Sequence, residues 1–170
     1  MPAWPDEAEL TACLPSLRRY ARGLARERDG ADDLVQDTLE RAWAARWQRR
    51  GDTRAWLFGI MHNLFVDRLR RQQRSPEVGS LDETSERAVA AAQTDRLELR
   101  DLERALARLP AEQREVLLLV GVESLAYAEV AAVVGVPVGT VMSRLSRARE
   151  RLRQELEGRR GDEPRIQRVK

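Results

Sequence analysis

The hydrophobic positions between residues 127 and 152 fall into two helical repeats that are separated by a short break. The segment reads YAEVAAVVGVPVGTVMSRLSRARERL, and its apolar residues are Ala128, Val130, Ala131, Val133 and Val134 before the break and Val138, Val141, Leu145, Ala148 and Leu152 after it. Gly135 can adopt the left-handed conformation that ends a helix, and Pro137 suits the start of the next helix. The pattern therefore predicts a helix-turn-helix, in which the small side chain of Ala131 lets the two helices cross closely.

The second helix of this pair carries hydrogen-bond donors and positive charge away from its apolar stripe. The candidate DNA-contacting residues are Thr140, Met142, Ser143, Arg144, Ser146, Arg147 and Arg149. Such a face can meet base edges and phosphates when a helix enters the major groove. A solvated, arginine-rich face on a plain helical hairpin is the alternative that the pattern leaves open.

The rest of the chain predicts five further helices, over residues 10–28, 32–47, 53–74, 95–109 and 110–121. We expect Pro15 in the first turns of the first helix, a turn at residues 29–32, and Thr53 as the N-cap of the third helix. No segment alternates apolar and polar residues as a strand does, so the sequence predicts an all-α protein with two small helical domains joined by a flexible linker. The expected bounds are 1–9 for an N-terminal tail, 10–74 for the first domain, 75–94 for the linker, 95–157 for the second domain and 158–170 for a C-terminal tail.

The helix predicted over residues 32–47 has two separate faces. One is an apolar stripe, which we expect to pack inward, and it consists of Leu34, Val35, Thr38, Leu39 and Ala42. The other is polar and mostly acidic, and it consists of Asp33, Gln36, Asp37 and Glu40. Periodicity favours a solvated surface for this acidic face, and a docking site for a basic partner helix is the alternative.

Arginine and tryptophan gather where the helical pattern lapses, around a loop marked by Gly51. The residues concerned are Arg46, Trp47, Arg49, Arg50 and Arg54. Aromatic faces stack on unstacked bases and arginine meets phosphates, so this loop is a candidate site for single-stranded nucleic acid. Trp56, in the next helix, is expected in the core.

Residues suited to catalysis or metal binding are few. Cys13 and His62 are the only residues of their kinds, so neither an internal disulfide nor a Cys/His metal site can be assembled, and both are expected to be ordinary structural or surface residues. A Ser/His/Asp device would have to use His62, and no phosphate-binding loop of the GxxxxGK[ST] type occurs. The sequence therefore argues against an enzyme and predicts no catalytic residue, metal, cofactor or small-molecule substrate.

Charge is distributed unevenly along the chain. The formal net charge is only +2, and every basic residue except Lys170 is arginine, which forms bidentate contacts with phosphates and base edges. Residues 144–170 hold ten basic and five acidic side chains, whereas residues 77–103 hold eight acidic and three basic ones, which predicts a nucleic-acid surface at the C-terminal end. No apolar run reaches the length of a membrane span and the N-terminus lacks the pattern of a signal peptide, so we expect a cytoplasmic protein that is not integral to a membrane.

Three segments, in this order, resemble the extracytoplasmic-function (ECF) class of bacterial RNA polymerase sigma factors, within the sigma-70 family. They are ADDLVQDTLERAWAARW, TRAWLFGIMHNLFVDRLRR and LARLPAEQREVLLLVGVESLAYAEVAAVVGVPVGTVMSRLSRARERL. The resemblance spans residues 10–156 apart from the linker, and it implies a region 2 helical bundle followed by a region 4 helix-turn-helix. It also implies a protein that binds core RNA polymerase and directs promoter-specific transcription initiation by recognising and melting promoter DNA.

The resemblance implies a role for each face described above. The acidic face of Asp33, Gln36, Asp37 and Glu40 matches the patch that docks on the clamp helices of the largest polymerase subunit, and the flap of the second-largest subunit is a further implied contact. Contacts with the promoter minus-ten element are implied for Arg46, Trp47, Arg49, Arg50, Arg54, Asn63, Asp67, Arg70, Arg71 and Arg74. Contacts with the minus-thirty-five element are implied for Thr140, Met142, Ser143, Arg144, Ser146, Arg147 and Arg149. The family often has Lys or Arg at Met142, so promoter preference at this position is left open.

The implied regulator is an anti-sigma factor that covers the same helical faces. One competing hypothesis is a stand-alone helix-turn-helix transcriptional regulator, which fails to explain the first 74 residues. Another is a sigma-like mimic that sequesters an anti-sigma factor; known mimics carry a receiver domain for which this chain has no room, and Arg144, Arg147 and Arg149 argue for DNA contact. The linker permits both a closed and an extended arrangement, so the sequence does not fix the relative placement of the two domains.

Overall fold

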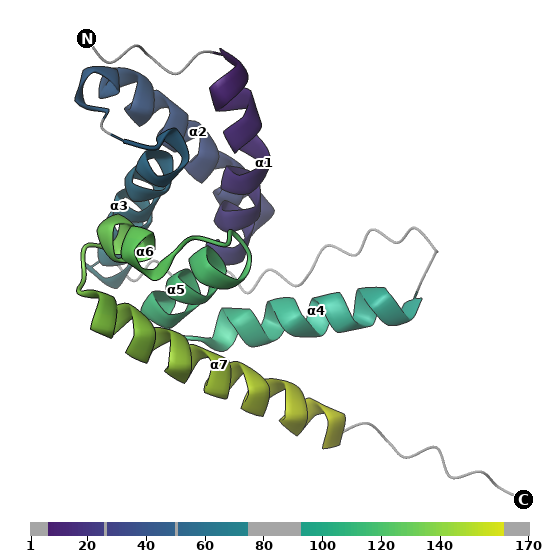
Figure 1. The fold of residues 1–170 in the computed structure, drawn as a ribbon. Coiled ribbons are helices and arrows are strands. Elements are labelled where there is room, and N and C mark those ends of the chain that lie inside the picture. Colours follow the sequence, from purple (N-terminus) through teal and green to yellow (C-terminus); the bar gives the residue numbers. More distant parts are fainter. Residues whose placement is uncertain (1–6, 26, 50, 75–92, 162–170) are drawn as a thin grey trace, which may run out of the picture.

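The computed structural model describes residues 7–25, 27–49, 51–74 and 93–161, which form seven α-helices and one short 3-10 helix (Figure 1). The helices are α1 (Glu7–Leu24), α2 (Arg28–Ala44), α3 (Thr53–Arg74), α4 (Gln93–Arg108), α5 (Ala111–Gly121), α6 (Tyr127–Val134) and α7 (Val138–Gly161), and the 3-10 helix η1 covers Arg46–Gln48. No strand occurs in the described residues, and the all-α prediction is confirmed. The predicted linker, residues 75–94, lies outside this part of the chain except for its last two positions, which begin α4.

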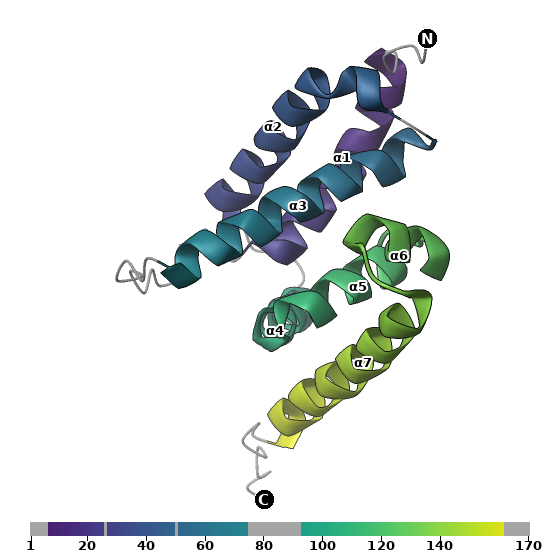
Figure 2. The ribbon, with the colours of Figure 1, turned by 90° about the vertical axis from the view of Figure 1, so that its left-hand side faces the viewer.

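The first half of the molecule is a bundle of α1, α2 and α3, which pack against one another (Figure 2). The largest buried side chains of these helices are Leu17, Tyr20, Leu24, Leu34, Leu57, Phe58 and Met61. The rings of Tyr20 and Phe58 meet edge to face, with their centroids 5.2 Å apart, a geometry that aromatic pairs favour. The apolar stripe predicted on α2 does face this core, since Leu34, Val35 and Ala42 are buried.

The first two helices begin at residues other than the predicted ones. Because α1 begins at Glu7, Pro15 is the ninth residue of the helix and lies in its interior, not in its first turns. Because α2 begins at Arg28, the expected turn at residues 29–32 is part of that helix. An acidic residue is favourable in the first turn of a helix as well as just before it, so Asp29 fits either position and does not fix the boundary.

Helix α3 has the predicted bounds, but its N-cap differs from the prediction. The N–H of Ala55 donates to the Asp52 Oδ2 atom at 2.8 Å, which is the contact that an N-cap residue makes three positions into a helix. Asp52 is therefore the cap, and Thr53 is buried as the first residue of the helix. The Thr53 hydroxyl instead contacts Arg49 and donates to the carboxylate of Glu9 at 3.3 Å.

The second half contains the predicted helix-turn-helix, made by α6 and α7, with α5 packed against both and α4 lying along α7. Gly135 ends α6 with φ of 67°, which confirms the left-handed conformation expected there. At the other end of α6, the N–H of Ala126 donates to the Glu129 carboxylate at 2.7 Å. The apolar stripe of α7 faces inward, with Val141, Leu145 and Ala148 buried.

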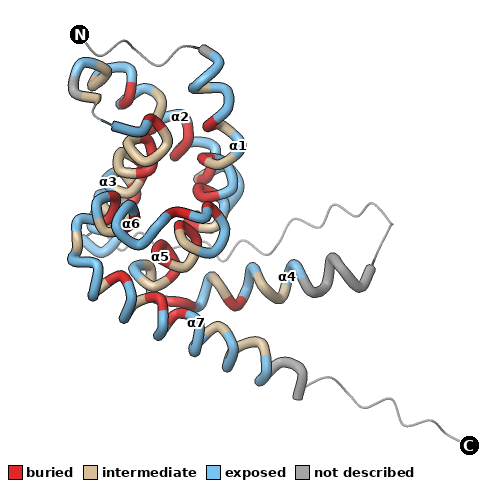
Figure 3. The backbone as a smooth tube through the Cα atoms, viewed as in Figure 1, coloured by how far each residue is buried: buried red, intermediate tan, exposed pale blue. Residues whose placement is uncertain are grey.

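The two halves lie against each other in a closed arrangement, with α5 and α4 beside α1 and α6 beside α3 (Figures 1 and 2). One continuous cluster of buried apolar side chains runs through both halves, and Figure 3 shows buried positions on the helix faces that meet. The halves approach closely at Gly23 of α1, where a β-carbon, if the residue had one, would lie 2.6 Å from the Leu118 Cδ1 atom of α5. A side chain at this point would force Leu118 to shift.

Within the described residues, no single helix is long and apolar enough to cross a membrane. Helices α6 and α7 meet that test only when they are taken together, as a pair bent by 100°.

Candidate polymerase and DNA interfaces

The acidic face predicted on α2 is solvent-exposed along its length, since Asp33, Gln36, Asp37 and Glu40 are all exposed. The Gln36 Nε2 atom donates to the Glu40 carboxylate at 3.0 Å, one helical turn away. The Asp37 carboxylate accepts a hydrogen bond of 2.6 Å from Arg68 of α3. The face thus presents acidic side chains that a basic partner can reach.

Two tryptophans and an arginine form an exposed stack where α2 ends. The Arg46 guanidinium lies 4.9 Å from the ring centroid of Trp43 and 4.8 Å from that of Trp47, within the range of cation–π attraction. Trp43 and Trp47 are 57% and 62% exposed, although large aromatic side chains normally bury most of their surface. The sequence pattern missed Trp43 because it precedes the point where helical periodicity lapses. Trp56, as expected, packs against the core.

Arg49 and Arg54, predicted in the same loop, point toward other parts of the protein. Arg49 pairs with Glu9 at 3.4 Å and its side chain is 18% exposed. Arg54 turns toward the second half, with its guanidinium over the Phe58 ring at 5.4 Å. Arg50 lies outside the described residues. The structure therefore brings Arg46 and Trp47 together and places Arg49 and Arg54 elsewhere.

The remaining residues predicted for the minus-ten element follow one another along α3. All of them are exposed: Asn63, Asp67, Arg70, Arg71 and Arg74. Asp67 and Arg70 approach within 3.9 Å, a distance at which an exposed ion pair contributes little. The C-terminal end of α3 is accordingly a positively charged surface open to a phosphate backbone.

The polar side of α7 carries the residues predicted to read the minus-thirty-five element. Met142, Ser143, Ser146, Arg147 and Arg149 are exposed, and Met142 is 53% exposed. Thr140 is half-buried, and its carbonyl oxygen accepts a hydrogen bond from the Ser143 hydroxyl at 3.0 Å. Arg144 is also half-buried and pairs with Glu112 of α5 at 2.8 Å. The helix therefore offers a face on which the charged donors Arg147 and Arg149 are exposed.

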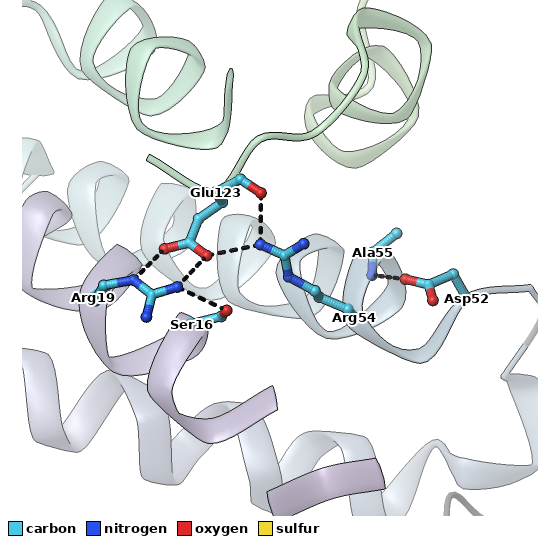
Figure 4. Close-up of polar contacts among 6 residues, drawn as sticks. All are labelled: Ser16, Arg19, Asp52, Arg54, Ala55 and Glu123. Carbon is cyan, nitrogen blue, oxygen red and sulfur yellow. Dashed lines mark hydrogen bonds and ion pairs between the residues drawn. The ribbon is translucent and has the colours of Figure 1, made fainter. Parts of the chain in front are cut away.

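Two buried carboxylates, which the sequence pattern did not single out, hold the halves together. The Glu123 carboxylate accepts two hydrogen bonds from Arg19 of α1, both 3.1 Å long, and one of 2.8 Å from Arg54 of α3 (Figure 4). Arg54 also donates to the Glu123 carbonyl oxygen at 2.6 Å. The sequence signals this residue only by placing an acid directly after the apolar run of residues 116–122, and periodicity alone does not connect it to α1 or α3.

The second buried carboxylate, Glu115, is shared by two residues of the first half. Its Oε1 atom accepts a hydrogen bond of 3.1 Å from the Tyr20 hydroxyl and lies 2.7 Å from His62 Nδ1. Burial, and then the neighbouring Glu115 charge, raise the pKa of Tyr20 well above its ordinary value, so Tyr20 stays protonated and remains a donor. His62 and Tyr20 therefore have roles at the contact between the halves.

Metal-binding and nucleophilic groups do not cluster in this region. In the part of the chain that the structure describes, no group of three or more His, Cys, Asp or Glu side chains could hold a metal ion. Cys13 is buried as a free thiol, and its burial raises its pKa.

Comparisons with known proteins cover both halves. Residues 10–62 match the family model of the Sigma2 domain of PhyR, and residues 99–152 match Sigma-70, region 4. The ECF RNA polymerase sigma factor EcfG of Rhodopseudomonas palustris (strain TIE-1) is 40% identical over 146 residues, which cover 85% of this chain and 81% of that protein.

Two solved structures are similar over most of the chain. The sigma factor RpoE of Bartonella quintana, in complex with the anti-sigma factor NepR, is 38% identical with a TM-score of 0.75, over 89% of this chain and 96% of that one. CnrH, in complex with the cytosolic domain of CnrY, is 30% identical with a TM-score of 0.66, over 88% and 85% of the two chains. With the region 2 bundle and the region 4 helix-turn-helix both present and in order, the chain belongs to the ECF RNA polymerase sigma factors.

Proposed function

We propose that this sigma factor binds core RNA polymerase through the acidic face of α2 and directs initiation at promoters that its two halves recognise. The observation that carries the proposal is the 40% identity to an ECF sigma factor over 85% of the chain. Asp33, Gln36, Asp37 and Glu40 are exposed and suit the basic clamp helices of the largest subunit. The flap of the second-largest subunit is the expected partner of the second half.

Promoter recognition is divided between the halves in this proposal. The stack of Trp43, Arg46 and Trp47 and the basic end of α3 would hold the opened minus-ten strand, since an extruded base needs an aromatic surface and its backbone needs positive charge. Helix α7 would enter the major groove of the minus-thirty-five element, where Arg147 and Arg149 can donate to phosphates or base edges and Met142 can meet a thymine methyl group. The protein itself would supply binding and no catalysis, and it would act in the cytoplasm, where bacterial polymerase works.

Regulation by an anti-sigma factor is part of the proposal. RpoE of Bartonella quintana, in complex with its anti-sigma factor, has a similar fold over 89% of this chain. The exposed faces of α2 and α7 are the surfaces that such a protein would cover.

The decisive experiment is run-off transcription with purified bacterial core polymerase. We expect specific transcripts that are absent from core polymerase alone and appear when the protein is added. Transcripts that stay absent, although the protein is folded and free of any inhibitor, would reject the assignment.

A sigma-like mimic is a second candidate, because residues 10–62 match the Sigma2 domain of PhyR. A mimic would bind an anti-sigma factor without starting transcription. The same run-off assay therefore separates the two candidates.

A further inference from the structure

Glu123 is buried in a place where only the other half of the molecule can pair with it. Its side chain is 0% exposed, although it lies in the short segment between α5 and α6. The guanidinium groups that bind its carboxylate belong to Arg19 of α1 and Arg54 of α3 (Figure 4). Because a carboxylate without such partners is costly to remove from water, Glu123 can be buried only while the halves are closed.

Arg54 binds Glu123 in the closed arrangement and is also an implied contact of promoter DNA. Guanidinium groups bind carboxylates and phosphates with the same planar set of donors. In the closed arrangement, the Arg54 Nη2 atom is 2.8 Å from the Glu123 carboxylate and 2.6 Å from its carbonyl oxygen. A nucleic-acid phosphate and Glu123 therefore require the same donors.

We propose that Glu123, Arg19 and Arg54 form an intramolecular latch, in which Glu123 competes with single-stranded DNA for Arg54 and holds the protein in a closed form with reduced DNA affinity. The competition rests on the proposed function and on the family resemblance, which implies a contact of Arg54 with the promoter minus-ten element. Closure itself rests only on the contacts between the halves.

The geometry suits a latch that can open. The side chains of Arg19 and Arg54 are 51% and 36% exposed, so water or a phosphate can reach them while Glu123 is still bound. Desolvation of the charged groups offsets part of the attraction in a buried ion pair, so the pair can separate when water or a phosphate takes the place of one partner. Ser124, the next residue, has φ of 56°, a left-handed backbone conformation that is uncommon for residues other than glycine.

A second buried carboxylate of the second half is also bound by residues of the first half. Glu115 of α5 is buried. Its carboxylate accepts a hydrogen bond from Tyr20 of α1 and lies against His62 of α3. Each buried carboxylate of the second half thus meets one group from α1 and one from α3. Opening must release both carboxylates to water, which makes the change between closed and open forms cooperative.

The test compares the full chain with Glu123→Gln and Arg19→Gln in two measurements. Small-angle X-ray scattering reports the radius of gyration, and fluorescence anisotropy reports affinity for a fluorescein-labelled 20-nucleotide single strand. We expect both variants to expand and to bind the strand about fivefold more tightly or better, because apparent affinity rises with the fraction of competent molecules.

Arg19→Gln is the sharper of the two variants, because it removes a positive charge. General electrostatics predicts weaker DNA binding for this change, whereas the latch predicts tighter binding. Glu103→Gln is the matched control for Glu123→Gln, since Glu103 is exposed on α4 and the change in charge is the same. We expect the control to leave the radius of gyration unchanged.

Arg54→Gln completes the set, because it removes both the latch and the proposed DNA contact. It should expand the protein without tightening its binding to the strand. Circular dichroism at 222 nm confirms that each variant keeps its helices, so expansion can be distinguished from unfolding.

The outcomes separate the latch from the proposed function. Variants that remain as compact as the wild type would overturn the latch, even if run-off transcription succeeds. Expansion of Arg19→Gln and Glu123→Gln without tighter binding than the Glu103→Gln control would overturn the competition for Arg54. Failure of run-off transcription would reject the sigma function while leaving the measured closure intact.

Discussion

Cys13 illustrates how burial sets the chemistry of a single side chain in the first half. Its thiol is 8% exposed, and burial, together with the neighbouring Asp52 charge, raises its pKa. The thiolate is the reactive form of cysteine, so a raised pKa lowers reactivity at a given pH. Cys13 is therefore a packing residue with a protected thiol.

We expect Cys13 to react with Ellman's reagent at pH 8 roughly tenfold more slowly, or slower still, in the folded protein than in guanidinium chloride. Both the low access and the small thiolate fraction contribute to the difference. The control is Cys13→Ala combined with Ala12→Cys, which places a thiol at the exposed neighbouring position. Equal rates for the native and the relocated thiol would show that Cys13 is not protected.

Helix α2 shows how one element can serve two purposes. Its apolar stripe packs on α1 and α3, while the opposite side presents carboxylates to solvent. The Thr38 hydroxyl donates to the Leu34 carbonyl oxygen at 2.7 Å, so even the polar residue within the stripe is satisfied inside the helix. The acidic face can consequently change without disturbing the core.

The N-terminus of α3 offers a test of helix capping. We expect Asp52→Ala to destabilise the protein by about 1 kcal/mol, because the Ala55 N–H loses its acceptor. Urea denaturation measures the change. Asp52→Asn keeps a side-chain oxygen and should change stability little, because Asn and Asp cap helices about equally well. Equal stability of the alanine variant and the wild type would mean that Asp52 does not cap α3.

Helical periodicity predicted the faces of the elements well and their ends less well. The stripe of α2, the core position of Trp56 and the left-handed Gly135 follow from spacing and from the backbone freedom of glycine, both of which are local properties. The cap of α3 was misassigned to Thr53 because Asp52 and Thr53 are adjacent and both residue types cap helices. When two adjacent residues have similar capping preferences, the packing around them decides which one caps the helix.

The closed arrangement could not be predicted from the sequence for a different reason. Arg19 and Glu123 are 104 residues apart, and Tyr20 and Glu115 are 95 apart. Nothing in hydrophobic periodicity links residues across such a separation. The acidic face of α2 and the basic face of α7 were predictable because each of them lies on one helix.

The contact of α1 with α5 depends on the lack of a side chain at Gly23. We expect Gly23→Ala to destabilise the protein by roughly 1–3 kcal/mol, because its β-carbon would overlap Leu118 and packed interfaces tolerate added volume poorly. This sign is opposite to that expected from helix propensity, which favours alanine over glycine by about 1 kcal/mol.

Gly59→Ala is the matched control for Gly23→Ala. It lies within α3, and a β-carbon there would meet nothing within 4 Å. Urea denaturation should show a gain or no change for Gly59→Ala and a loss for Gly23→Ala. A gain in both variants would mean that the halves do not meet closely at Gly23.

The two functional faces lie on different helices, so single substitutions should separate their activities. We expect Arg147→Ala to weaken binding to duplex promoter DNA about tenfold, since one base or phosphate contact contributes about 1–3 kcal/mol. The duplex is the DNA that lies upstream of the start of the run-off transcripts. Its affinity for core polymerase should not change. Arg153→Ala is the control, because Arg153 lies farther along α7 and pairs with Glu150 and Glu157.

Asp37→Arg should have the converse effect, with weaker core binding and unchanged affinity for duplex DNA, because a reversed charge would oppose a basic partner. The substitution also breaks the 2.6 Å pair between Asp37 and Arg68, so that loss has to be measured separately. Arg68→Gln breaks the same pair but leaves the acidic face intact, and it should retain core binding. If Arg68→Gln weakened core binding as much as Asp37→Arg, the pair would matter through the packing of α2 on α3. The acidic face would then not be the docking surface.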